Sequence, residues 1–216
     1  FRRVLFRSHY CQAFAEVAHE RGWACALPHF RGCSGELNHA PRAYHSGDYE
    51  EIAWILAQLR ARHPGPVIAA GVSLGGNALL RWAAEAGSDA SSHVKAVAAI
   101  CSPLDLAAGG HAIGRGFNRQ IYTRMFLRTM IPKALRKWEQ HPGLFDRDAL
   151  LAARDLYAFD NVFTAPVHGF RNTEDYWHRA SAKPLLSHIR VPALVVNALN
   201  DPFVPASSLP RDGEVG

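Results

Sequence analysis

The chain has 216 residues, of which 48% are hydrophobic and 20% are charged, a balance typical of globular proteins. It carries 24 Lys and Arg against 19 Asp and Glu, a formal net charge of +5. No apolar run reaches the roughly 18–20 residues of a transmembrane helix and no secretory signal is visible, so we expect a cytoplasmic protein. The four cysteines include no CxxC pair, which argues against a zinc site or a redox dithiol.

Residues 1–7 contain three arginines and no acidic residue. They have no periodicity that continues into the rest of the chain, so we interpret them as a leader foreign to the domain. Without them, 21 basic and 19 acidic residues remain, a net charge of +2. This small excess makes nucleic acid a poor candidate partner.

Helix and strand signals alternate from Ser8 onward. The expected elements of the first half are, in chain order, a helix from Ser8 to about Arg21 ended by Gly22, a buried strand at Trp23–Leu27, a helix capped by Asp48 and ended at His63, a strand at Val67–Val72, a helix to about Ala86 ended by Gly87, and a strand at Val94–Cys101. Asp48 and Glu51 have the spacing of a capping box.

The alternation stops after residue 104. Residues 105–178 are expected to form helices and loops without a strand, and Pro192–Ala198 to form a further strand. Strands alternating with helices predict an α/β fold, with a mostly parallel sheet covered by helices on both faces. We therefore expect a core made of residues 8–104 and 179–216, with residues 105–178 as a helical cap insertion.

The segment Gly71-Val72-Ser73-Leu74-Gly75 has the GxSxG pattern of a nucleophile elbow. A serine on a tight turn between strand and helix exposes its hydroxyl above the sheet, and glycines on either side, with Gly76, avoid clashes in the bend. The N–H of Leu74 can then donate to a developing oxyanion. The alternative is a glycine-rich turn that only packs or that binds a phosphate.

A nucleophilic serine needs a histidine base and usually an acid, in the chain order Ser, Asp or Glu, His on this fold. Asp201, just after the last expected strand, fits the acid; its alternative role is that of a turn former, and Asp105 is the reserve candidate. No histidine follows Asp201. We expect His168, His178 and His188, which precede it, to be ordinary polar or capping residues, and His45 to be a packing residue.

These motifs together resemble the YheT-type α/β-hydrolases, also described as the AB-hydrolase 4 group. The resemblance covers nearly the whole chain from about Ser8. Its carriers are Glu20-Arg21-Gly22-Trp23, His29-Phe30-Arg31-Gly32-Cys33-Ser34-Gly35-Glu36, Tyr44-His45-Ser46-Gly47, Gly71-Val72-Ser73-Leu74-Gly75-Gly76-Asn77, Ile189–Pro192 and Asn200-Asp201-Pro202-Phe203.

The resemblance implies an α/β-hydrolase core with a helical cap, carboxyl-ester hydrolase activity, Ser73 as nucleophile and Asp201 as acid. It also implies a His-Gly oxyanion loop where residues 1–7 stand, and a histidine beyond Gly216. We therefore expect an internal fragment, truncated at both ends and itself inactive, of a serine esterase acting on an acyl or lipid-like ester without a metal or organic cofactor. The alternative is a non-catalytic scaffold or lipid-binding protein on the same fold.

A basic amphipathic helix is expected inside the cap. Its apolar positions are Ile121, Tyr122, Met125, Phe126, Thr129 and Met130, and Arg115, Arg119, Arg124 and Arg128 occupy other positions. One interpretation is a lid whose apolar side meets an acyl chain while its arginines attract an anionic lipid surface. The other is a helix packed on the core with a solvated basic face.

Overall fold

The computed structural model describes residues 9–211 and 213–214, so the leader at residues 1–7 and the expected capping residue Ser8 lie outside the described residues. The described residues belong to two compact units, with the boundary between Ala40 and Pro41. Among the described residues, no helix is both long and apolar enough to cross a membrane.

The first unit contains helix α1 (His9–Glu20), which ends as expected at Gly22. Gly22 has a φ of +69°, its N–H donates to the carbonyl of His19, and the N–H of Trp23 donates to that of Ala18. These two bonds satisfy carbonyls that the helix end leaves free.

The prediction of a strand at Trp23–Leu27 is wrong. The segment is irregular and Trp23 is 54% exposed. A strand exists only where a neighbouring backbone pairs with it, and no part of residues 9–40 forms a ladder with this segment. A run of apolar side chains is therefore not enough to predict a strand at Trp23–Leu27.

The second unit contains a parallel sheet of three strands in the order β1 (Ile68–Val72), β2 (Ala96–Ile100) and β3 (Ala193–Val196). Val72 is in register with Ile100, and Ile100 with Val196. The three strands therefore end level at one edge of the sheet. Each strand lies within a segment that the sequence predicted, and the α/β fold class is confirmed.

Helices flank this sheet in the same unit. Helix α2 (Tyr49–Arg62) begins at Asp48, whose carboxylate accepts from the N–H of Glu51 as the capping-box spacing predicted. Helix α3 (Leu74–Ala86) packs against β1, β2 and α2. The main hydrophobic core lies here and includes Leu80, Val97 and Leu186. The remaining short elements of this part are η1 (Gly87–Asp89), α4 (Ala90–His93), η4 (Lys183–His188) and η5 (Ala206–Ser208).

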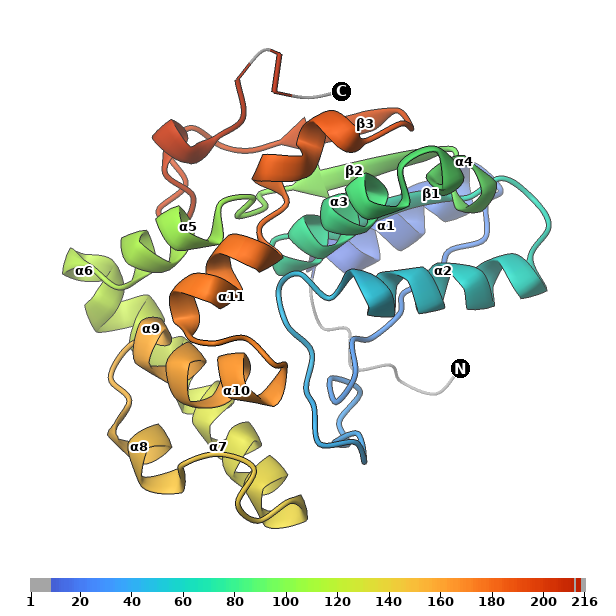
Figure 1. Cartoon of the computed structure of the whole chain (residues 1–216). Helices are drawn as coiled ribbons and strands as arrows, with labels where there is room; N and C mark the ends of the chain where they lie inside the picture. Colours follow the sequence, from blue (N-terminus) through green and yellow to red (C-terminus); the bar gives the residue numbers. More distant parts are fainter. Residues whose placement is uncertain (1–8, 212, 215–216) are drawn as a thin grey trace. The chain divides into compact units, whose positions relative to one another are not determined.

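Residues 105–178 contain no strand, as expected. Their elements are α5 (Leu106–Ile113), α6 (Gly116–Asn118), the π-helix η2 (Arg119–Thr123), α7 (Arg124–Gln140), α8 (Arg147–Ala152), α9 (Leu156–Phe159), the π-helix η3 (Asp160–Thr164), α10 (Ala165–Val167) and α11 (Thr173–Ala180). Figure 1 shows α7 to α10 gathered away from the strands. Helices α5 to α11 have hydrophobic clusters separate from the core on the sheet, one around Leu150 and Phe163 and another around Ala165 and Trp177.

Candidate active site

Ser73 is the one residue between the last residue of β1 and the first of α3. Its backbone has φ 53° and ψ −124°, a left-handed conformation that residues with a Cβ rarely adopt, and its side chain is exposed. The amides of Gly76 and Asn77 donate to its carbonyl at 3.0 and 3.3 Å. Such backbone strain costs about 1–3 kcal/mol and is concentrated at functional sites.

Two glycines around Ser73 leave no room for a side chain. A Cβ on Gly71 would lie 2.4 Å from the carbonyl oxygen of Gly75, and one on Gly76 would lie 1.9 Å from Ser102 Oγ. Gly71 therefore permits the close return of the chain after the bend, and Gly76 permits α3 to approach the end of β2. These short distances agree with the prediction that glycines avoid clashes in the bend at Ser73.

The first amides of α3 lie directly beside Ser73. An α-helix leaves its first N–H groups without partners inside the helix, and Leu74 and Gly75 hold the first two positions of α3. The helix dipole also places partial positive charge at this end. A negative charge that develops near the Ser73 hydroxyl would be stabilised here.

Asp201 lies five residues after the end of β3, in a loop that leaves the same sheet edge as Ser73. It is half-buried, and its Oδ1 accepts a 2.8 Å hydrogen bond from the N–H of Phe203. This contact is typical of a turn former, the alternative role that the sequence analysis gave to Asp201. It uses Oδ1, so Oδ2 can still bind another partner. The structure brings Asp201 and Ser73 to one edge, but within residues 9–211 their side chains share no hydrogen bond.

Asp105, the reserve acid, follows β2 and begins α5. Its Oδ1 accepts from the N–H of Ala108 at 3.0 Å. The carboxylate is thus engaged as a helix cap, a role that stabilises a helix by about 1 kcal/mol.

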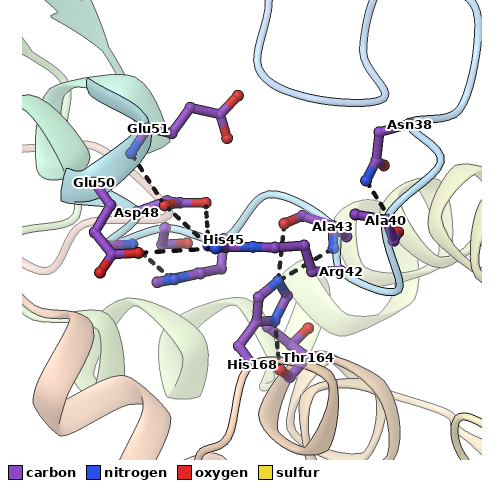
Figure 2. Close-up of polar contacts among 12 residues, drawn as sticks. Asn38, Ala40, Arg42, Ala43, His45, Asp48, Glu50, Glu51, Thr164 and His168 are labelled. Carbon is purple, nitrogen blue, oxygen red and sulfur yellow. Dashed lines mark hydrogen bonds and ion pairs between the residues drawn. The ribbon is translucent and has the colours of Figure 1, made fainter. Parts of the chain in front are cut away.

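His45 is a packing residue and His168 a polar residue bound to backbone carbonyls, as expected for each (Figure 2). His168 Nδ1 lies 2.7 Å from the carbonyl oxygen of Thr164, and its Nε2 lies 2.9 Å from that of Ala43. His45 accepts from the N–H of Gly47, and its ring centroid is 4.8 Å from that of His168. In the part of the chain that the structure describes, no histidine hydrogen-bonds to Ser73 or Asp201.

Sequence reasoning gave no role to Asn77, four residues after Ser73. This side chain is fully buried, its Nδ2 donates to the carbonyls of Ser46 and Ala180, and its Oδ1 accepts from the N–H of Ala182. Asn77 therefore joins the helix behind Ser73 to two distant segments. An asparagine inside an apolar helix was the available signal, because a buried amide requires partners.

A buried polar cluster lies between the helical region and the loop before α2. Asp160 accepts hydrogen bonds from Thr164 Oγ1 and Trp177 Nε1, yet burial raises the pKa of its carboxyl group to about 6. Burial and the nearby charge of Asp160 also raise the pKa of Tyr176, whose Oη accepts from the N–H of Ser46. Nothing in the local sequence around Asp160 distinguishes it from an exposed helix residue.

Comparisons with known proteins agree with this architecture. Residues 7–214 match the family model described as alpha/beta hydrolase fold. The chain is 36% identical to YheT of Escherichia coli (strain K12), over 94% of this chain and 60% of that protein. It is 29% identical to phospholipase ABHD3 of Mus musculus and 27% identical to monoacylglycerol lipase of Saccharomyces cerevisiae, over 90% and 95% of this chain respectively and 47% of each relative. The chain thus spans about half the length of these relatives.

Proposed function

Because this chain belongs to the alpha/beta hydrolase fold family, we propose that it carries the acyl-transfer site of a serine carboxyl-ester hydrolase. The observation that carries the proposal is the exposed Ser73, held at a positive φ between β1 and α3. Two relatives are named a phospholipase and a monoacylglycerol lipase, which supports an ester of a lipid as the substrate class.

In the proposed reaction, Ser73 Oγ attacks the carbonyl carbon of the ester while a histidine takes its proton. The carbonyl oxygen becomes an oxyanion that accepts from the N–H of Leu74. The tetrahedral intermediate collapses to an acyl-serine as the protonated histidine gives its proton to the leaving alcohol. Water then attacks the acyl-serine by the same route and releases the carboxylic acid, and Asp201 orients the histidine throughout.

The histidine of this mechanism is proposed to lie outside these 216 residues, as is a second oxyanion donor. No histidine follows Asp201 in the sequence, and His45 and His168 are engaged with backbone groups away from Ser73. Loss of a triad residue lowers turnover by roughly 10⁴–10⁶. The 216-residue chain alone should therefore show no measurable ester hydrolysis.

Residues 105–178 are proposed to be a cap on a core formed by residues 8–104 and 179–216. The separate hydrophobic clusters of α5 to α11 support this division. A cap of this kind would enclose the acyl chain of a substrate bound above Ser73.

A chimera tests the nucleophile without assuming what surrounds these residues in the whole protein. Residues 8–216 replace the matching region of YheT, and YheT supplies the remaining 40% of its own length. A fluorophosphonate probe should label Ser73 in the chimera, and Ser73→Ala should abolish the labelling. A chimera with a native far-ultraviolet spectrum that stays unlabelled, or is labelled at another residue, would refute the assignment and favour the non-catalytic scaffold.

A further inference from the structure

Three exposed apolar side chains form a row along α6, η2 and the start of α7. Phe117 is 70% exposed, Ile121 45% and Met125 50%. They are four residues apart, and the wider turn of the π-helix η2 keeps residues at this spacing on one side of the helix. Of the two interpretations of this helix, packing of its apolar side on the core does not hold for Ile121 and Met125.

The opposite side of the same helix faces the protein. Thr123, Leu127 and Ala134 are buried, and Leu127 and Ala134 belong to the cluster that includes Phe145 and Leu150. The helix is thus fixed by one side while the row of Phe117, Ile121 and Met125 stays in contact with water. An ordered helix that exposes three large apolar side chains in line suggests a binding surface.

Unneutralised positive charge lies next to this row. Leu106–Trp138 contains seven Lys and Arg and no Asp or Glu. Arg124 and Arg128 are exposed and lie one residue before Met125 and the exposed Thr129. Among the described residues, neither arginine forms an ion pair with a carboxylate.

We propose that this face, made of Phe117, Ile121 and Met125 with Arg124 and Arg128, docks on an anionic lipid surface. The apolar row would enter the boundary between headgroups and acyl chains, and the two guanidinium groups would bind lipid phosphates. The positive charge of the face favours an anionic bilayer over a neutral apolar partner. A neutral partner would leave the two arginines without an ion pair, whereas an anionic bilayer offers acyl chains to the apolar row and phosphates to the arginines.

The helix that carries the docking face contacts the loop that holds Asp201 through other side chains. Asn118 Nδ2 donates to the carbonyl of Pro202 at 2.8 Å, and the ring centroids of Tyr122 and Phe203 are 4.6 Å apart. Phe203 is the residue whose N–H bonds to Asp201. Docking would therefore bring the lipid surface next to the edge of the sheet that carries the site, a consequence that rests on the proposed function although the docking itself does not.

Vesicle flotation tests the docking, with phosphatidylcholine vesicles that contain or lack phosphatidylglycerol. The 216-residue chain should float only with the anionic vesicles, and bound protein should decrease as salt screens the arginines. The double variant Arg124→Gln/Arg128→Gln should weaken partitioning about tenfold or more. Ile121→Ser/Met125→Ser should weaken it comparably.

The matched control is Arg147→Gln/Arg190→Gln, which removes the same charge from other elements and should change partitioning far less. All three variants replace exposed side chains, so their unfolding midpoints should stay near that of the parent chain. Equal loss in the control, unchanged binding by Ile121→Ser/Met125→Ser, or no binding to anionic vesicles would overturn the proposal. So would a dimer in analytical ultracentrifugation that Ile121→Ser/Met125→Ser dissociates, because a second copy would then occupy the face. None of these readouts depends on ester hydrolysis.

Discussion

The backbone N–H of Ser73 donates a 2.9 Å hydrogen bond to the carbonyl oxygen of Ile100, the last residue of β2. This bond extends the ladder between β1 and β2 by one residue, so the chain stays paired through the start of the bend. The arrangement is repeated on the next strand, where the N–H of Cys101 donates to Val196 and Cys101 has a φ of 49°. Two non-glycine residues with positive φ therefore lie at the same sheet edge, each held by a ladder bond.

The strain at Ser73 predicts that removal of its Cβ stabilises the fold. Ser73→Gly should raise the free energy of unfolding by about 1 kcal/mol, because glycine adopts a φ of 53° without steric cost and this gain exceeds its larger loss of backbone entropy. Ser73→Ala keeps the Cβ and should leave stability nearly unchanged. Urea unfolding of both variants measures the difference, and equal midpoints would show that the strain is not at the Cβ.

The approach of Gly76 to Ser102 predicts a destabilising Gly→Ala substitution in a helix, where this change ordinarily stabilises. Gly76→Ala should lower the free energy of unfolding by about 2 kcal/mol, because the new methyl group would lie 1.9 Å from Ser102 Oγ. Adding Ser102→Ala removes that oxygen and should restore part of the loss. A double-mutant cycle by urea unfolding gives the coupling, and additive effects would contradict the contact.

The three hydrogen bonds of Asn77 predict an unusual pH dependence for an isosteric variant. Asn77→Asp places carboxylate oxygen against the carbonyls of Ser46 and Ala180 and should cost about 3 kcal/mol at neutral pH. At acidic pH the introduced carboxyl group is protonated and donates one hydrogen bond, so stability should partly return. Asn77→Ala is the control, since it leaves the same partners unpaired but has no group to titrate. Unfolding curves of both variants at several pH values measure this difference. The same pH dependence in Asn77→Asp and Asn77→Ala would contradict the prediction.

The partly buried carboxyl group of Asp160 should make the fold less stable as pH rises from about 4 to about 6. Its pKa is raised from 3.8 to about 6, so the folded state holds the proton more tightly than the unfolded state and stability is greatest when the group is protonated. The full penalty above pH 6 is on the order of 3 kcal/mol. Asp160→Asn should remove this component, which the difference between the two unfolding profiles measures. Parallel profiles would show that Asp160 does not titrate in this range.

Most elements of the fold could be predicted from the sequence because their signals are local. Asp48 and Glu51 mark the start of α2, and the run from Val67 to Gly76 predicts a strand, a bend and a helix in the observed order. The segment Trp23–Leu27 shows the limit of such reasoning. Its apolar pattern is that of a strand, but pairing depends on a neighbouring backbone that the pattern does not contain.

Residues that lie close together along the chain were enough to predict the GxSxG bend, its place between strand and helix, and the α/β class. The packed fold was needed to show that Asp105 caps α5, that Asn77 ties α3 to Ser46 and Ala180, and that Ile121 and Met125 face water and not the core. The physical reason is that backbone conformation follows from residues a few positions apart. Burial, hydrogen-bond partners and pKa values depend on groups that lie close only after distant segments have packed together.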